Sequence, residues 1–137
     1  MNGMIENRFL LDTNAVIYLT TKGNSISNDI EKQLDEADLF ISIISEIELF
    51  SKPEIPQDEE ENLRSFISER LPVINLSSAI KNETINLRRK IKHKLPDCIV
   101  AATAIVLDAV LLTADKKLLN ISFPGLRTQN ILPDHQF

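Results

Sequence analysis

Cysteine is almost absent from this sequence, because Cys98 is the single one among 137 residues. A disulfide within the chain is therefore excluded, and so is a zinc site built from several cysteines. A chain without disulfides fits a reducing compartment, so we expect the protein in the cytoplasm.

Long hydrophobic runs are absent as well. The longest apolar stretch, Cys98 to Leu107, has about half of the length that a bilayer span requires. The first residues, MNGMIENRFLLD, lack the basic start and the long apolar core of a signal peptide. We therefore expect a protein that is neither exported nor inserted in a membrane.

Positive charge is scarcer than negative charge. The chain has 15 lysines and arginines against 20 acidic residues, a net charge of -5 and a pI of about 5.0. Contact with nucleic acid would therefore need a local basic patch. The most basic stretch is 88–94 (RRKIKHK), for which two interpretations stay open. It can stabilise the C-terminal end of a helix, or it can contact phosphates, with Arg88, Arg89, Lys92 and Lys94 as candidates.

The sequence does contain short apolar strands that alternate with helices. Strands are expected at 8–11, 39–44, 73–76, 109–112 and 126–131. Helices are expected at 13–20, from about 27, at 45–51, from 58, from 77 to 95 and from 97 to 107, with a short helix or turn at 115–119. The apolar spacing predicts that Ile47 and Phe50 point inward and that Leu95 continues the apolar face of the long helix.

This alternation is typical of a parallel sheet that helices cover on both faces. We expect an α/β fold, namely a three-layer α/β/α sandwich around a short parallel sheet of four to five strands. With 43% hydrophobic residues, the chain can build one core. We therefore expect a single domain over 1–137, with its core from about 8 to 132. Binding sites in such sheets form beyond the carboxyl ends of the strands.

Four acidic residues stand near those strand ends or at a helix start: Asp12, Glu48, Asp97 and Asp115. Two carboxylates in contact repel each other by roughly 1 to 4 kcal/mol, and a hard divalent cation with oxygen ligands removes that penalty. Singly, Asp12 and Asp97 could cap helices, and Asp115 could lie in a solvated turn. Together they predict a magnesium or manganese site. Without histidine or cysteine ligands, such a site points to phosphoryl chemistry rather than zinc hydrolysis.

Four segments carry a resemblance to a known family. They are 11–14 (LDTN), 41–49 (ISIISEIEL), 96–102 (PDCIVAA) and 112–115 (LTAD). In this order and spacing they resemble the PIN domain and, within it, the VapC-type toxins of type II toxin–antitoxin systems. The resemblance extends from Phe9 to about Leu132. It implies the PIN-like fold and a magnesium- or manganese-dependent endoribonuclease, in which metal-activated water attacks an RNA phosphodiester.

The resemblance also assigns roles to residues. The acidic positions of the family are matched by Asp12, Glu48, Asp97 and Asp115. Asp12 and Asp97 would bind the metal most directly, and the other two would bind it directly or through water. The polar positions that line the pocket are matched by Thr13, Asn14 and Thr113. A VapB-like antitoxin, which inserts a segment into a groove walled by the helices within 13–36, and a homodimer are further expectations.

Glu46 competes with Glu48 for the second acidic position. The acidic residue of the motif lies six positions beyond a serine, and Glu48 has that spacing from Ser42. Glu46 would point about 200° away on the same helix. The two cannot both face one pocket, so Glu48 is the predicted site residue.

Rival functions have distinct requirements. A phosphatase of the haloacid dehalogenase type needs a second aspartate two positions after Asp12, where this chain has Asn14. A receiver domain needs adjacent acidic residues after the first strand, and none are present. A non-catalytic interaction module of PIN-like fold or another magnesium-dependent phosphatase stays the alternative to a nuclease.

Overall fold

The computed structural model describes residues 7–21 and 26–133. Within them, parallel strands form one five-stranded sheet in the order β3-β2-β1-β4-β5. The strands are β1 (Arg8–Leu11), β2 (Asp38–Ser42), β3 (Val73–Ile74), β4 (Val110–Thr113) and β5 (Thr128–Asn130). The predicted α/β class and parallel sheet are confirmed.

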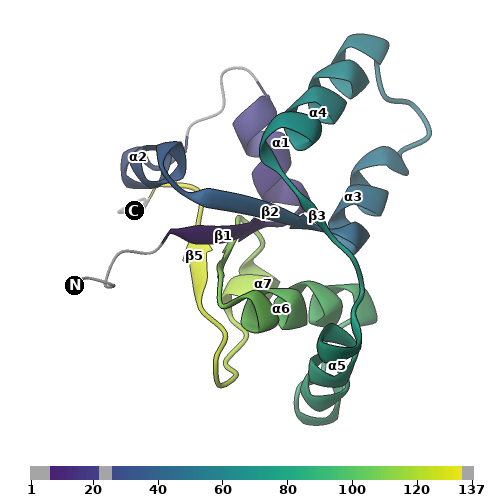
Figure 1. Ribbon diagram of the computed structural model, residues 1–137, viewed down its shortest axis with the longest axis vertical. Coiled ribbons are helices and arrows are strands. Elements are labelled where there is room, and N and C mark those ends of the chain that lie inside the picture. Colours follow the sequence, from purple (N-terminus) through teal and green to yellow (C-terminus); the bar gives the residue numbers. More distant parts are fainter. Residues whose placement is uncertain (1–6, 22–25, 134–137) are drawn as a thin grey trace.

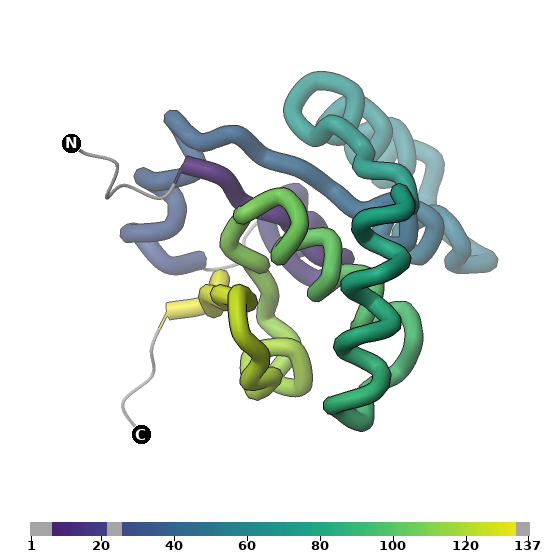
Figure 2. The backbone as a smooth tube through the Cα atoms, turned by 60° about the horizontal axis from the view of Figure 1, so that its bottom comes forward, coloured from purple at the N-terminus to yellow at the C-terminus, as the bar shows by residue number. Residues whose placement is uncertain are grey.

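Helices cover both faces of this sheet, as predicted (Figures 1 and 2). One face carries α1 (Thr13–Thr20), α2 (Asn28–Asp35), α3 (Ile43–Phe50) and α4 (Gln57–Arg70). The other face carries α5 (Ser78–Lys90), α6 (Leu95–Leu107) and α7 (Lys116–Leu119).

The side chains of β1 alternate between the two layers. Phe9 and Leu11 pack into the core with α1, α2 and α4, whereas Leu10 packs with Leu111 of β4 under α6. All three β1 residues are buried. A strand that is apolar at consecutive positions is what a sheet buried on both faces requires.

The strand order reverses beside β1. The chain passes from β1 to β2 and β3 on one side, then returns to place β4 and β5 on the other side. The gap that this reversal opens beyond the carboxyl ends of β1 and β4 is where ligands bind in such sheets. The backbone N–H of Asp12 donates to the carbonyl of Leu112 at 3.2 Å, so the ends of these two strands are level.

Several predicted boundaries differ from the structure. β2 ends at Ser42 instead of residue 44, because the Ser42 hydroxyl accepts from the Ile44 N–H at 3.1 Å and begins α3 there. The long helix ends at Lys90, and Leu95 opens the next helix.

The predicted inward orientation of Ile47 is wrong, since 55% of its surface is exposed. Leu95 is likewise 50% exposed. Periodicity identified apolar residues without showing which of them have a packing partner.

No helix in the described ranges combines the length and the apolar character that crossing a bilayer takes. Residues 1–6, on which part of the signal-peptide expectation rests, lie outside those ranges.

Candidate active site

The predicted acidic residues converge on one cavity at the switch in strand order. It measures about 240 Å³, and its walls come from the start of α1, from α3, from the first turns of α6 and from the segment after β4. The lining residues are Asp12, Thr13, Asn14, Ser45, Glu48, Asp97, Val100, Asp115 and Leu118. All four carboxylates of the prediction are thus brought together, although they come from four separate parts of the chain.

Asp12 is the most buried of these carboxylates, with 6% of its surface exposed. It is the N-cap of α1, and its Oδ1 accepts from the Ala15 N–H at 2.9 Å. Burial raises the pKa of Asp12 from 3.8 to about 6. Hydrogen bonds from Thr113 and Ala15 act in the opposite direction, while the charges of Asp115 and Glu48 raise it further. Capping and a role in the pocket are compatible, because each carboxylate oxygen keeps a free lone pair.

Thr113 connects Asp12 to Asp115. Its hydroxyl donates to Oδ2 of Asp12 and accepts from the backbone N–H of Asp115 at 2.9 Å. Asp115 in turn caps α7 through the Lys117 N–H at 2.8 Å. The family resemblance predicts that Thr113 lines the pocket. Its side chain is instead fully buried and is not part of the cavity wall, and it holds the wall residue Asp12 through its hydrogen bond.

Glu48 enters the cavity from α3 and accepts a hydrogen bond from the Thr13 hydroxyl at 3.0 Å. This bond ties α3 to the first residue of α1. Glu46 is not among the residues that line the cavity, so the position of Glu48 agrees with the spacing argument.

Asp97 is the third residue of α6, where Lys94 is the N-cap. The expectation that Asp97 itself opens or caps this helix is wrong, because Pro96 is accommodated in the first turn. Its side chain accepts no hydrogen bond from any residue in the described ranges. A carboxylate in the first turn is favoured by the helix dipole, and its oxygens are free to bind a ligand.

Ser45 is a pocket residue that sequence reasoning missed. It is fully buried on α3 and lines the cavity. Among the described residues, its hydroxyl has no hydrogen-bond partner. Buried hydroxyls are normally satisfied, so an unpaired one beside a cavity indicates a ligand or water. Its sequence signal was weak, because serine in a helix has many ordinary explanations.

The family of the chain follows from a comparison with known proteins. The family model of the PIN domain matches residues 9–124, which carry all four carboxylates. The chain belongs to the PIN domain family. A comparison with curated protein sequences gives no match.

Solved structures similar to this PIN domain come from toxin–antitoxin complexes. One is VapBC2 from Rickettsia felis bound to a DNA fragment from their promoter, with 26% identity, a TM-score of 0.72, and coverage of 90% of this chain and 98% of that chain. Another is a toxin–antitoxin complex from Klebsiella pneumoniae, with 27% identity, a TM-score of 0.63, and coverage of 85% and 93%. A third is the DNA-bound VapBC from Salmonella typhimurium, with 23% identity, a TM-score of 0.68, and coverage of 90% of this chain and 98% of that chain. At this identity it supports the fold alone. The predicted resemblance is confirmed, and the chain is consistent with a toxin nuclease of this family.

PIN nucleases generally use divalent metal ions, so the cavity can be compared with what such an ion requires. As the side chains of the described residues lie, no three acidic, histidine or cysteine groups are close enough to hold an ion. The donors are all oxygens, which suits magnesium or manganese. A cation would also offset the free-energy cost of burying the ionised Asp12 carboxylate. A metal-bound water would give the Ser45 hydroxyl a hydrogen-bond partner. The residues therefore fit a hard divalent ion.

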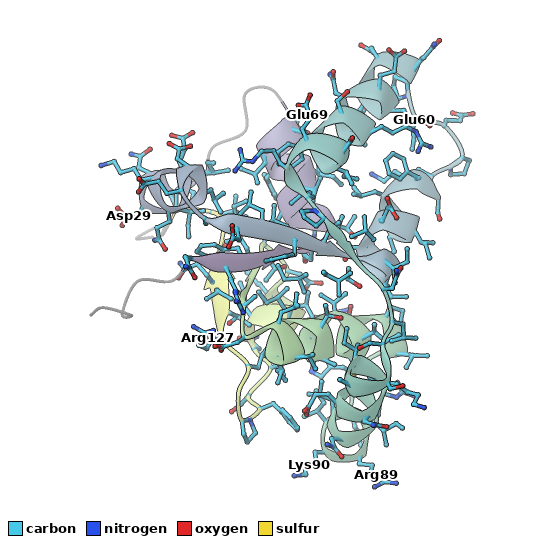
Figure 3. The ribbon with its side chains drawn as sticks, in the orientation of Figure 1. Asp29, Glu60, Glu69, Arg89, Lys90 and Arg127 are labelled. Carbon is cyan, nitrogen blue, oxygen red and sulfur yellow. The ribbon has the colours of Figure 1, made fainter. Side chains whose placement is uncertain are left out.

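The predicted phosphate contacts lie outside this cavity. Arg88, Lys92 and Lys94 line a separate depression of about 430 Å³ beside the start of α6. Arg89 is not part of its wall and projects from the C-terminal tip of α5 (Figure 3).

Proposed function

We propose that this PIN domain is a magnesium- or manganese-dependent endoribonuclease and the toxin of a type II toxin–antitoxin pair in the cytoplasm. The observation that carries the proposal is the convergence of Asp12, Glu48, Asp97 and Asp115 on one cavity at the switch in strand order. A cavity lined by four carboxylates and by a buried hydroxyl that has no partner among the described residues suits a metal ion and its water shell.

Each side chain has a task that its contacts support. Asp12 and Asp97 would hold the ion directly, and Glu48 and Asp115 would hold it directly or through water. When bound, a divalent ion acidifies a water molecule and polarises a phosphate. Thr113 and the Ala15 N–H orient the Asp12 carboxylate and favour its ionised form. Thr13 holds Glu48 toward the cavity, and Ser45 would donate to a water or phosphate oxygen.

Cleavage of total RNA tests this function. The unaltered protein should cut RNA in magnesium, stop in EDTA, and lose activity in the Asp12→Asn variant. Mapping the product ends would identify the cleaved sites. Cleavage that continues in EDTA or in Asp12→Asn would rule out the proposed mechanism.

An inhibitory VapB-like antitoxin is the proposed partner. Support comes from the toxin–antitoxin complexes among the structural neighbours and from a depression of about 230 Å³ between α1, α2 and α4. This depression combines apolar side chains, including Leu34 and Phe66, with the two exposed carboxylates of Glu31 and Asp35 and one cation, Arg70, which donates to the Leu34 carbonyl at 3.1 Å. It suits a segment with apolar anchors and a basic residue. The helices at 13–36 were expected to wall such a groove, and α4 adds a third wall.

The product of the adjacent gene provides the test for this partner. Added to the purified protein, it should stop RNA cleavage, and Phe66→Glu should weaken that inhibition without changing cleavage itself. Equal activity on RNA with and without this product would contradict the proposed pairing. The homodimer that the family resemblance implies is also proposed here, and the mass of the protein in solution checks it separately.

A further inference from the structure

Positive charge is concentrated between α5 and α6. Residues 88–94 contain five of the chain's 15 lysines and arginines, and no acidic residue occurs between Glu83 and Asp97. Within the described ranges, none of these five cations forms an ion pair with a carboxylate. On a chain with a net charge of -5, this segment is a local cationic surface.

Helix stabilisation explains only part of this charge. Arg88, Arg89 and Lys90 occupy the last turn of α5, where cations interact favourably with the helix dipole. Lys92 and Lys94 lie beyond that helix, and Lys94 is the N-cap of α6 without a side-chain capping bond. A cation at a helix N-terminus opposes the dipole and lacks the capping oxygen of serine or aspartate. A residue that breaks a local rule in this way often serves a function.

The cationic side chains fall into two groups. Arg88, Lys92 and Lys94 line the depression beside α6, together with Ile91 and His93. The Arg88 guanidinium donates to the His93 carbonyl at 2.8 Å, which fixes the connection between the helices. The second group, Arg89 and Lys90, projects from the tip of α5 (Figure 3).

The depression and the carboxylate cavity both have a wall residue at the start of α6. Lys94 borders the depression and Asp97 borders the cavity, and three residues of helix advance only about 4.5 Å along the axis. A strand that crosses the N-terminus of α6 would therefore touch both. Cations at this point also offset the repulsion that an acidic protein exerts on a polyanion.

We propose that Arg88, Lys92 and Lys94 bind the phosphate backbone of single-stranded RNA immediately beside the cleaved bond. The identity of the polyanion rests on the proposed function. Contacts of this kind hold and orient a strand without reading its bases. The three cations thus set the affinity for RNA, while the carboxylates perform the chemistry.

A salt titration of RNA binding tests this proposal with matched charge changes. The full chain binds a fluorescein-labelled single-stranded RNA in EDTA, and affinity is measured by anisotropy between 50 and 200 mM salt. The salt slope is the slope of log affinity against log salt concentration. Its magnitude should fall by about 1.4 in Lys92→Gln/Lys94→Gln. Between 50 and 200 mM salt, the unaltered protein should therefore lose about seven times more of its affinity than this variant does. Arg89→Gln/Lys90→Gln removes the same charge from the tip of α5 and should change the slope by less than half as much. Thermal unfolding checks that both variants fold.

Three results would overturn the proposal. They are equal slopes in the two double variants, no binding of RNA by the unaltered protein, and competition by poly-glutamate as strong as that by RNA of equal charge. The last result would assign the depression to an acidic protein segment.

Cleavage assays separate this proposal from the proposed function. If RNA binds with the expected slopes but is not cut in magnesium, the nuclease function fails and the binding site stands. If RNA is cut and Lys92→Gln/Lys94→Gln leaves KM unchanged, the binding site alone fails. The expected result is a raised KM with an unchanged kcat.

Discussion

The hydroxyl of Thr113 donates a hydrogen bond to Oδ2 of Asp12, 101 positions away in the sequence. The bond joins the ends of β1 and β4 at the switch in strand order. It favours the ionised form of a carboxylate whose pKa burial raises to about 6. The fraction of Asp12 that is ionised near neutral pH therefore depends on Thr113.

Thr113→Val should weaken both the site and the fold. Valine keeps the shape but leaves the buried Asp12 oxygen and the Asp115 N–H without a partner. We expect a loss of about 1.5 to 3 kcal/mol in the free energy of unfolding and an acidic limb of the pH–activity profile that moves to higher pH. The control is Thr103→Val, whose buried hydroxyl only bonds the Ile99 carbonyl within α6. If both variants shift the pH profile equally, Thr113 does not act through Asp12.

Asp12→Asn should remove a pH dependence of stability from the metal-free protein. Because the folded pKa of about 6 exceeds the ordinary 3.8, the folded state binds more protons between these values. Folding stability from this group therefore falls as pH rises from about 4 to 6. The loss amounts to roughly 3 kcal/mol at pH 7. Urea unfolding measures the free energy of unfolding at pH 4 and pH 7. The value for the variant should rise relative to that of the unaltered protein only at pH 7. The same difference at both pH values would contradict the raised pKa.

Ser45→Ala should separate activity from stability. Its buried hydroxyl has no partner among the described residues, so removing it should change the free energy of unfolding by less than about 1 kcal/mol. Loss of a hydrogen bond to a water or phosphate oxygen in the cavity should reduce kcat by about tenfold. Ser45→Thr should restore part of the activity because it returns the hydroxyl. An alanine variant with full activity would show that this hydroxyl has no role in the reaction.

Glu48→Gln and Glu46→Gln form a matched pair on α3. Glu48 lines the cavity, whereas Glu46 does not. We expect Glu48→Gln to lower cleavage by about 10²-fold and Glu46→Gln to leave it within about twofold of the unaltered protein. A larger loss in Glu46→Gln would reverse the assignment. The measurement is the initial rate on one defined RNA at saturating magnesium.

Short-range patterns predicted the strands and placed two of the acidic residues near strand ends. The apolar runs that end at Leu11 and Thr113 marked β1 and β4; Asp12 follows the first run directly, and Asp115 follows the second after one residue. In a parallel sheet the carboxyl ends share one edge, so their convergence with Glu48 could be anticipated. Their function as metal ligands stays a prediction.

Features that depend on tertiary partners were not predictable from the sequence. Apolar spacing continues from Ile91 to Leu95, yet α5 ends at Lys90 because Leu95 and Pro96 start α6. Proline is tolerated in a first helical turn, so its position did not decide the boundary. Only the assembled cavity shows that the Ser45 hydroxyl lines it and lacks a hydrogen-bond partner within residues 7–21 and 26–133.

Electron paramagnetic resonance of Mn²⁺ binding, combined with RNA cleavage in the same samples, tests whether this cavity is a metal-dependent nuclease site. We expect bound Mn²⁺ and cleavage to rise together in the unaltered protein, and we expect Asp97→Asn to lose both while keeping its fold. Asp108→Asn, which changes an exposed carboxylate at the far end of α6, should retain both. Cleavage without bound Mn²⁺, or equal Mn²⁺ binding by Asp97→Asn, would contradict a metal-dependent nuclease site in this cavity.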